Sequence, residues 1–207
     1  MYLMFSLGIL CALNYGIMVS NTPAELITKY AELTNFDVSR PEIFSTMTIG
    51  TSIGAMIAQF SLKPIVSKLG LYKSLFIFLP LDILFNIMNC FAVHYIYFLF
   101  VMICIGFCTG SYLTLIPIVA ADQIDPKLRG MYMATISINI NLGVLFGYIL
   151  SLFVKLNNIQ YDNWWAMHLV CVVLCIVATA FLYFTYAQKK KLDKLKAEYN
   201  DVRTVTP

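Results

Sequence analysis

Apolar residues along the chain gather into six runs, which short polar stretches separate. Each run is close to the length of about 20 residues with which a helix crosses the hydrocarbon core of a bilayer. A membrane-spanning segment must satisfy its own backbone hydrogen bonds, and the alternation typical of a β-barrel strand is missing here. The pattern therefore predicts six transmembrane helices, at residues 1–22, 43–62, 72–93, 95–121, 131–154 and 165–187.

The composition places these helices in lipid, because 60% of the 207 residues are hydrophobic and only 12% are charged. Average soluble chains carry about twice that share of charged residues. A domain of this size cannot bury so much apolar surface, so the excess faces the lipid bilayer. The first run lacks a basic segment before it and a small-x-small cleavage site after it, and we therefore expect it to be retained. The chain is predicted to be a multi-pass, all-α membrane protein.

The basic residues predict the orientation of the helices, since cytoplasmic loops carry an excess of Lys and Arg. One side holds Lys63, Lys68, Lys73, Lys127, Arg129, Lys189, Lys190, Lys191, Lys194, Lys196 and Arg203, and the other side holds only Lys29, Arg40 and Lys155. Both termini are therefore expected to be cytoplasmic, with the plasma membrane as the expected location. Residues 1–187 form the six-helix unit, and residues 188–207 form a basic cytoplasmic tail. This bias explains the net charge of +3, so nucleic acid is not an expected partner.

Residues that carry chemistry are sparse. All six cysteines lie in predicted spans, and two pairs of them are four residues apart. Metal binding by such a pair would need further ligands, which the sequence does not offer. We expect free thiols in apolar packing, with no metal and no other cofactor. Nucleophile arrangements and phosphate-binding loops are also missing, so an enzyme is not expected. Small residues recur every four positions, which predicts close helix packing, at Gly50, Gly54, Ala58, Gly106, Gly110, Gly143 and Gly147.

A charged segment, "AADQIDPKLRG", joins the fourth and fifth predicted helices. Asp122 ends one helix, Arg129 begins the next, and Pro126 stops the first from continuing. An acid and a guanidinium at two helix ends can pair, and the pair can break when the helices shift. In the alternative interpretation, Lys127 and Arg129 only set the orientation of the helices in the membrane, while Asp122 and Asp125 are solvated turn residues.

Asp82 is an acid near the middle of the third predicted helix, shortly after Pro80, with Asn86 and Asn89 on the following turns. An ionised aspartate at that depth costs about 2.5–3.5 kcal/mol on insertion scales. It must therefore be neutral, paired or facing a wet cavity. One hypothesis makes Asp82 a proton-coupling site, and the other makes it a protonated or asparagine-bonded packing residue.

Three stretches in the same order resemble the sugar porter family of the major facilitator superfamily, and within it the facilitative glucose transporters. They are "NYGIMVSNTPAELITKYAEL", "IGAMIAQFSLKPIVSKLGLYKS" and "GFCTGSYLTLIPIVAADQIDPKLRGMYMATISININLGVLFG". The matching positions are Tyr15, Asn21, Pro23, Gly54, Phe60, Ser61, Gly70, Ser74, Gly106, Gly110, Asp122, Arg129, Gly130 and Gly143. The resemblance implies the amino-terminal half of a major facilitator fold, built from two inverted three-helix repeats. It also implies facilitated transport of a glucose-like hexose by alternating access.

The resemblance assigns roles to residues. Asp122, Arg129 and, with an eroded motif, Lys68 match a cytoplasmic charge network that latches the two halves of the family fold. Ser137 falls where the family places a sugar-binding glutamine, and Asn141, four residues on, could supply the missing amide. Asn14, Tyr15 and Asn21 are expected to contribute to the cavity wall, and interhelical hydrogen bonding is the alternative role for these polar groups.

The second half of the family fold is missing from the chain, so the other cavity wall must come from elsewhere. The sources are a longer chain, a second copy in a homodimer, or a separate partner that acts as the second transporter half. In the competing interpretation, this is a non-transporting, truncated or degenerate half that acts as a membrane interaction or regulatory protein. The sequence leaves these alternatives open.

Overall fold

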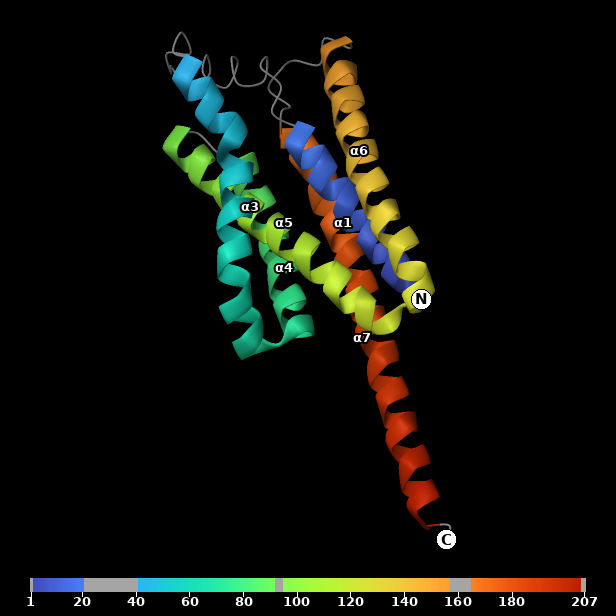
Figure 1. Cartoon of the computed structure of the whole chain (residues 1–207). Helices are drawn as coiled ribbons and strands as arrows, with labels where there is room; N and C mark the ends of the chain where they lie inside the picture. The colour runs from blue at the N-terminus through green and yellow to red at the C-terminus, as the bar shows by residue number, and fades with distance from the viewer. Residues whose placement is uncertain (1, 21–40, 92–94, 157–164, 206–207) are drawn as a thin grey trace.

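The computed structural model describes residues 2–20, 41–91, 95–156 and 165–205, and all regular elements in these ranges are α-helices (Figure 1). They are α1 (Tyr2–Ser20), α3 (Pro41–Leu69), α4 (Leu71–Cys90), α5 (Tyr95–Gln123), α6 (Pro126–Leu156) and α7 (Trp165–Val205). In the described residues, five helices are long and apolar enough to cross a membrane, and α1 contributes a shorter apolar stretch, Ser6–Ser20. The predicted all-α membrane fold is confirmed.

The helix contacts follow an internal two-fold pattern. The first three helices are α1, α3 and α4, and the second three are α5, α6 and α7. The first helix of each set packs against the second helix of the other set, as α1 on α6 and α5 on α3. The third helix of each set packs against the first helix of the other set, as α4 on α5 and α7 on α1. Figure 1 shows α1 and α5 running in opposite directions. These exchanges are those of two inverted three-helix repeats.

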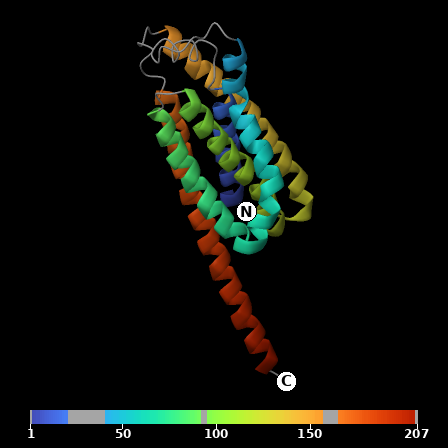
Figure 2. The ribbon, with the colours of Figure 1, turned by 90° about the vertical axis from the view of Figure 1, so that its left-hand side faces the viewer.

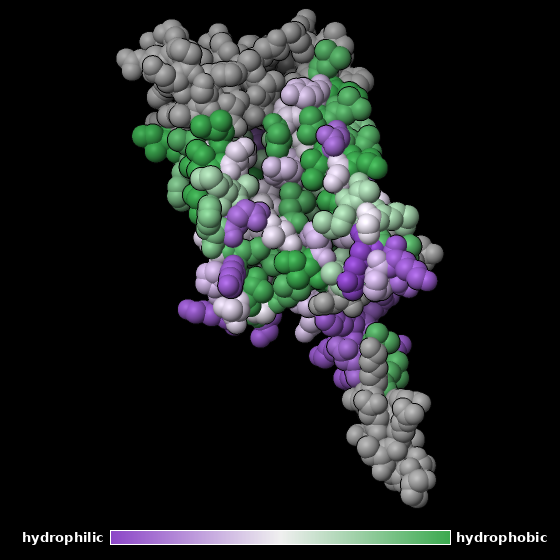
Figure 3. Space-filling model, viewed as in Figure 1, coloured by the Kyte–Doolittle hydropathy of each residue, from purple (hydrophilic) through white to green (hydrophobic). Residues whose placement is uncertain are grey.

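One end of the bundle is rich in basic residues, and we call it the basic end. It carries the turn between α3 and α4, the turn between α5 and α6, and the part of α7 that leaves the bundle (Figures 1 and 2). Hydrophilic side chains gather at this end, while hydrophobic side chains cover the body of the bundle (Figure 3). The N-terminus and the C-terminus lie toward this same end. The helix α7 continues without a break past residue 187, so the described part of the expected tail is helical.

Close helix packing at the small residues is confirmed. A Cβ atom added to Gly54 of α3 would overlap the carbonyl oxygen of Ile103 in α5, and one added to Gly106 would overlap that of Thr51. The pair α1 and α6 meets in the same way, with Gly16 against Gly143. Since these neighbours are backbone atoms, no side-chain rearrangement can make room for a larger residue.

The two turns at the basic end have distinct causes. Gly70, between α3 and α4, has a φ of 84°, which is a left-handed conformation that side chains with a Cβ rarely adopt. Between α5 and α6, the side chain of Asp125 accepts a hydrogen bond from the backbone N–H of Lys127 at 3.0 Å. Asp125 therefore caps α6, and Pro126 begins it, earlier than Arg129, where the sequence predicts this helix to begin.

Candidate functional site

A buried polar cluster surrounds Asp82 in the middle of the bundle. Its carboxylate is fully buried and accepts hydrogen bonds from donors on four helices. One oxygen accepts from Nδ2 of Asn14 in α1 at 3.2 Å, from the hydroxyl of Tyr112 in α5 at 3.3 Å, and from the thiol of Cys175 in α7 at 3.1 Å. The other oxygen accepts from Nδ2 of Asn86 at 3.1 Å. The cluster therefore joins α1, α4, α5 and α7 through one acid.

The cluster extends from Asp82 along α4 to His168 near the start of α7. Nδ2 of Asn89 lies 2.9 Å from Nε2 of His168, and Nδ1 of His168 lies 3.4 Å from Oδ1 of Asn86. Asn89 can donate to Nε2 only if the imidazole proton is on Nδ1, which then donates to Asn86. Every donor in this row points toward Asp82. The row leads from the acid toward the end of the bundle opposite the basic end.

Two buried amide oxygens in the cluster have no hydrogen-bond partner, Oδ1 of Asn14 and Oδ1 of Asn89. Nδ2 of Asn14 faces Asp82 and lies 2.8 Å from the hydroxyl of Tyr112. If Asp82 took up a proton, rotation of the Asn14 amide by half a turn would present Oδ1 as the acceptor that a carboxylic acid needs. Asn14 can therefore serve either protonation state of Asp82.

The titratable groups that face Asp82 are uncharged in their ordinary forms. They are the phenol of Tyr112 and four thiols, and among the described residues no lysine or arginine acts on the carboxylate. The thiols belong to Cys11, Cys108, Cys171 and Cys175. None of the six cysteines forms a disulfide, and the described residues include no cluster of acids, histidines and cysteines that would hold a metal ion.

The predicted cavity residues lie on a different surface from this cluster. Ser137 and Asn141 are exposed on α6, one turn apart, and Nδ2 of Asn141 donates to the backbone oxygen of Ser137 at 2.9 Å. Tyr15 is half-buried on α1, the helix on which α6 packs. Asn21 lies outside the described residues. Asn14, which the sequence suggests for the cavity wall, is instead buried in the Asp82 cluster.

The predicted charge network lies at the basic end. Lys68 is exposed in the last turn of α3, and Arg129 is exposed near the start of α6. The guanidinium of Arg129 donates a hydrogen bond to the backbone oxygen of Ala121 at the end of α5. Asp122 belongs to the last turn of α5, and its side chain lies outside the described residues. The pairing of Asp122 with Arg129 therefore stays a prediction.

Sequence reasoning missed most of the partners of Asp82. The sequence does predict Asn86 as a bonding partner, because it follows Asp82 by four residues and shares its helix face. Tyr112, Cys175 and His168 come from other helices, and only the need of a buried acid for partners could have directed attention to them. A shallow pocket of about 420 Å³ between α3 and α5 was also missed, with Gln59 donating to Thr114 at 2.7 Å on its wall.

A family profile described as Major Facilitator Superfamily matches residues 4–205. A solved structure titled "Crystal structure of D-xylose-proton symporter" aligns with a TM-score of 0.75 and 14% sequence identity, over 96% of this chain and 53% of that chain. The TM-score shows a shared fold, and the chain spans about half the length of that solved protein. No curated protein matched the sequence.

Proposed function

The chain belongs to the major facilitator superfamily, and we propose that it is a half-length facilitative transporter for a glucose-like hexose that works by alternating access. Membership of this superfamily agrees with the predicted membrane location and transport role, and with the expectation that the chain is not an enzyme. The sugar porter subfamily, the substrate and the mode of transport are parts of the proposal.

The observation that carries the proposal is the exposed polar face of α6. Ser137 and Asn141 are exposed there among apolar side chains such as Ile138 and Leu142. Polar groups at membrane depth are expensive unless they face protein or water. Neutral hydroxyl and amide groups also suit a sugar, which offers hydroxyls to bond. We therefore assign Ser137 and Asn141, with Tyr15 on the neighbouring helix and Asn21, to one wall of a sugar-binding cavity.

The second wall has to come from outside these 207 residues. The chain covers 53% of the symporter chain, which is consistent with one half of such a fold. A continuation of the chain, a second copy or a separate protein could each provide the other half. The charge network of Lys68, Asp122 and Arg129 at the basic end is proposed to latch the two halves on the cytoplasmic side while the cavity is open outward.

Asp82 is the candidate proton site of this transporter. It is buried among neutral donors, and Asn14 can serve both its protonated and its ionised form. His168 and Asn86 extend the hydrogen-bonded row toward the opposite end of the bundle, which is the outer side in the proposed orientation. In this proposal, proton binding at Asp82 changes the hydrogen bonds that hold α1, α5 and α7 together. The alternative is a protonated or asparagine-bonded packing residue, which is the role that agrees with the facilitative transport proposed above.

Reconstitution tests the proposal. The purified chain in liposomes is expected to admit radiolabelled D-glucose faster than L-glucose, and replacement of Ser137 and Asn141 by leucine should abolish this difference. Leu142→Ile, on the same helix, is the matched control and should leave uptake unchanged. A folded chain without stereoselective uptake would exclude a second copy as the missing half. It would leave a longer chain, a separate partner, or the non-transporting alternative, a membrane interaction or regulatory protein, which the serine at the glutamine position favours.

The proton hypothesis has its own measurement. If Asp82 couples protons to transport, a proton gradient directed into the liposomes drives sugar accumulation by the unmodified chain, whereas purely facilitative transport equilibrates the sugar without accumulation. Asp82→Asn should lose this accumulation and retain downhill exchange. If accumulation is equal in both chains, or is not affected by the gradient, Asp82 is a packing residue.

A further inference from the structure

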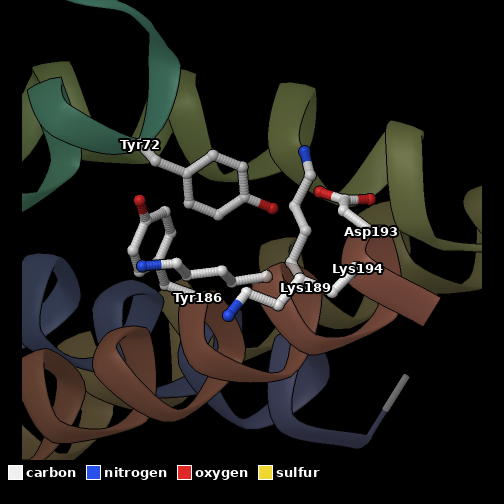
Figure 4. A pocket seen from close by; sticks show the side chains of 6 residues that line it. Tyr72, Tyr186, Lys189, Asp193 and Lys194 are labelled. Carbon is white, nitrogen blue, oxygen red and sulfur yellow. The ribbon is translucent and has the colours of Figure 1, made fainter. Parts of the chain in front are cut away.

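A pocket at the basic end has no part in the proposed transport cycle. It lies between the start of α4 and the part of α7 that leaves the bundle, and its volume is about 370 Å³ (Figure 4). Figure 4 shows Tyr72 of α4 on one side and side chains of α7 on the other. The lining residues are Tyr72, Tyr186, Lys189, Lys190, Asp193 and Lys194.

Aromatic packing fixes one wall of the pocket. The ring centroids of Tyr72 and Tyr186 lie 5.7 Å apart, and Phe76 meets Tyr186 edge-on at 5.6 Å. Nζ of Lys189 lies 4.5 Å from the centroid of the Tyr72 ring, which is a cation–π distance. The lysine is thereby held at the α4 side of the pocket, with its remaining N–H donors available to a ligand.

The charges of the pocket select an anion. Three lysines and one aspartate line it, which leaves an excess of two positive charges. Lysine ammonium groups and tyrosine hydroxyls are donors that suit phosphate oxygens. A ligand that combines a phosphate with an apolar body would meet both the lysines and the aromatic wall.

The level of the pocket relative to the bilayer indicates that the phosphate belongs to a lipid headgroup. Tyr72 is the second residue of α4, and Tyr186 lies three residues before Lys189, the first lysine of the α7 extension. Toward the body of the bundle, both helices expose apolar side chains, such as Ile77 and Phe184. Tyrosines followed by lysines mark the boundary between hydrocarbon and headgroups. The pocket therefore lies at headgroup depth, beside the apolar surface that acyl chains cover.

We propose that this pocket binds the phosphate headgroup of an anionic phospholipid in the leaflet at the basic end. The lysines contact the phosphate, the tyrosine rings contact the glycerol region, and the acyl chains follow the exposed apolar faces of α4 and α7. Basic pockets between membrane helices on the cytoplasmic side bind such headgroups. Lipid bound here would fix α7 against α4 where α7 leaves the bundle.

Lipid retention measures this binding in the full chain. The protein is purified from nanodiscs that contain phosphatidylcholine with phosphatidylglycerol, and the retained lipids are counted by native mass spectrometry. The pocket variant replaces Lys189, Lys190 and Lys194 by glutamine. The matched control replaces Lys73, Lys127 and Lys191, which lose the same charge at the basic end outside the pocket. Size-exclusion chromatography and circular dichroism check that each variant is folded.

The unmodified chain and the control are expected to retain phosphatidylglycerol in preference to phosphatidylcholine. The pocket variant should lose this preference by tenfold or more, since each lysine near an anionic surface is worth about fivefold in binding. Tyr72→Leu, which removes the ring under Lys189, should weaken retention, whereas Tyr72→Phe should keep most of it.

Three outcomes would overturn the proposal. Equal losses in the pocket variant and the control would show general surface attraction without a site. Equal retention of the two lipids by the unmodified chain would show no selection of an anion. Displacement of the retained lipid by millimolar inorganic phosphate would identify a soluble phosphate as the ligand. None of these measurements depends on sugar transport.

Discussion

At the scale of single residues, Asp82 is the position with the largest expected effect on stability. Asp82→Leu removes the hydrogen bonds that its carboxylate accepts from Asn14, Tyr112, Cys175 and Asn86. Nδ2 of Asn14 keeps the hydroxyl of Tyr112 as an acceptor, and Nδ2 of Asn86 keeps the backbone oxygen of residue 82. Hydrogen bonds inside membrane proteins average about 0.6 kcal/mol, so four of them predict a loss of roughly 2 kcal/mol. Asp82→Asn keeps the volume and one acceptor oxygen and should lose about half as much.

Thermal unfolding in detergent, followed by tryptophan fluorescence, measures this difference. Exposed Ile77 on the same helix provides the control, because Ile77→Leu removes no hydrogen bond and should not change the melting temperature. A melting temperature of Asp82→Leu equal to that of the unmodified chain would mean that the four hydrogen bonds to the carboxylate do not stabilise the bundle.

Asp125 provides a second prediction at this scale. Its side chain accepts from the N–H of Lys127, so Asp125→Ala should cost about 1 kcal/mol, the usual value of a helix N-cap. Asp125→Ser, which keeps an oxygen at the same place, should retain most of the stability. The same thermal measurement compares the two, and equal melting temperatures would remove the capping role.

The sequence predicts residues of this kind unevenly. A lone acid in an apolar helix signals that it needs partners, and an asparagine four residues on is the nearest candidate. The donors on α1, α5 and α7 are far away in sequence and come close only through the packing of the helices. For the same reason Asn14 was assigned to the cavity wall, although its helix turns it toward Asp82.

At the scale of the helices, the small residues decide how closely pairs approach. Gly54→Ala would place a Cβ atom on the carbonyl oxygen of Ile103, so α3 and α5 would have to separate. Gly130→Ala is the matched control, because nothing lies within 4 Å of the Cβ it would add. Gly54→Ala should lower the melting temperature, while Gly130→Ala should raise it slightly, by the helix preference of alanine of about 0.5–1 kcal/mol. If the two variants melted alike, the close approach of α3 and α5 would be wrong.

Helix positions follow from the sequence because they depend on local chemistry. Apolar runs of spanning length mark the helices, but α6 begins at Pro126, before Arg129, because the polar first turn of this helix lacks the apolar pattern. The length of α7 was not predicted, since its polar extension lacks the apolar pattern from which the spans were found. The pocket beside Tyr72 depends on that extension and was missed with it.

At the scale of the whole molecule, the exchange of helix partners between the two repeats joins the six described helices into one bundle. Each repeat covers the first helix of the other, so neither is expected to pack alone. The helix α6, by contrast, is mostly exposed, because only 17% of its apolar spanning segment is buried inside the bundle. A residue on that exposed face can therefore report a second copy. If two copies associate there, Asn141→Cys should form a disulfide-linked dimer on oxidation, and the exposed Tyr183→Cys on α7 should not.

The orientation of the molecule is the prediction on which the charge network and the lipid pocket both depend. Basic residues gather at one end of the bundle, and the positive-inside rule places that end in the cytoplasm. Gly130 lies at the basic end, and Phe91 is exposed at the opposite end of α4, a helix of 20 residues that is long enough to cross the bilayer. In intact cells, a membrane-impermeant maleimide should label Phe91→Cys above the level of the unmodified chain and should label Gly130→Cys only after permeabilisation. The reverse result would place the basic end outside, where a latch between halves could not close toward the cytoplasm and an inner-leaflet lipid could not reach Lys189.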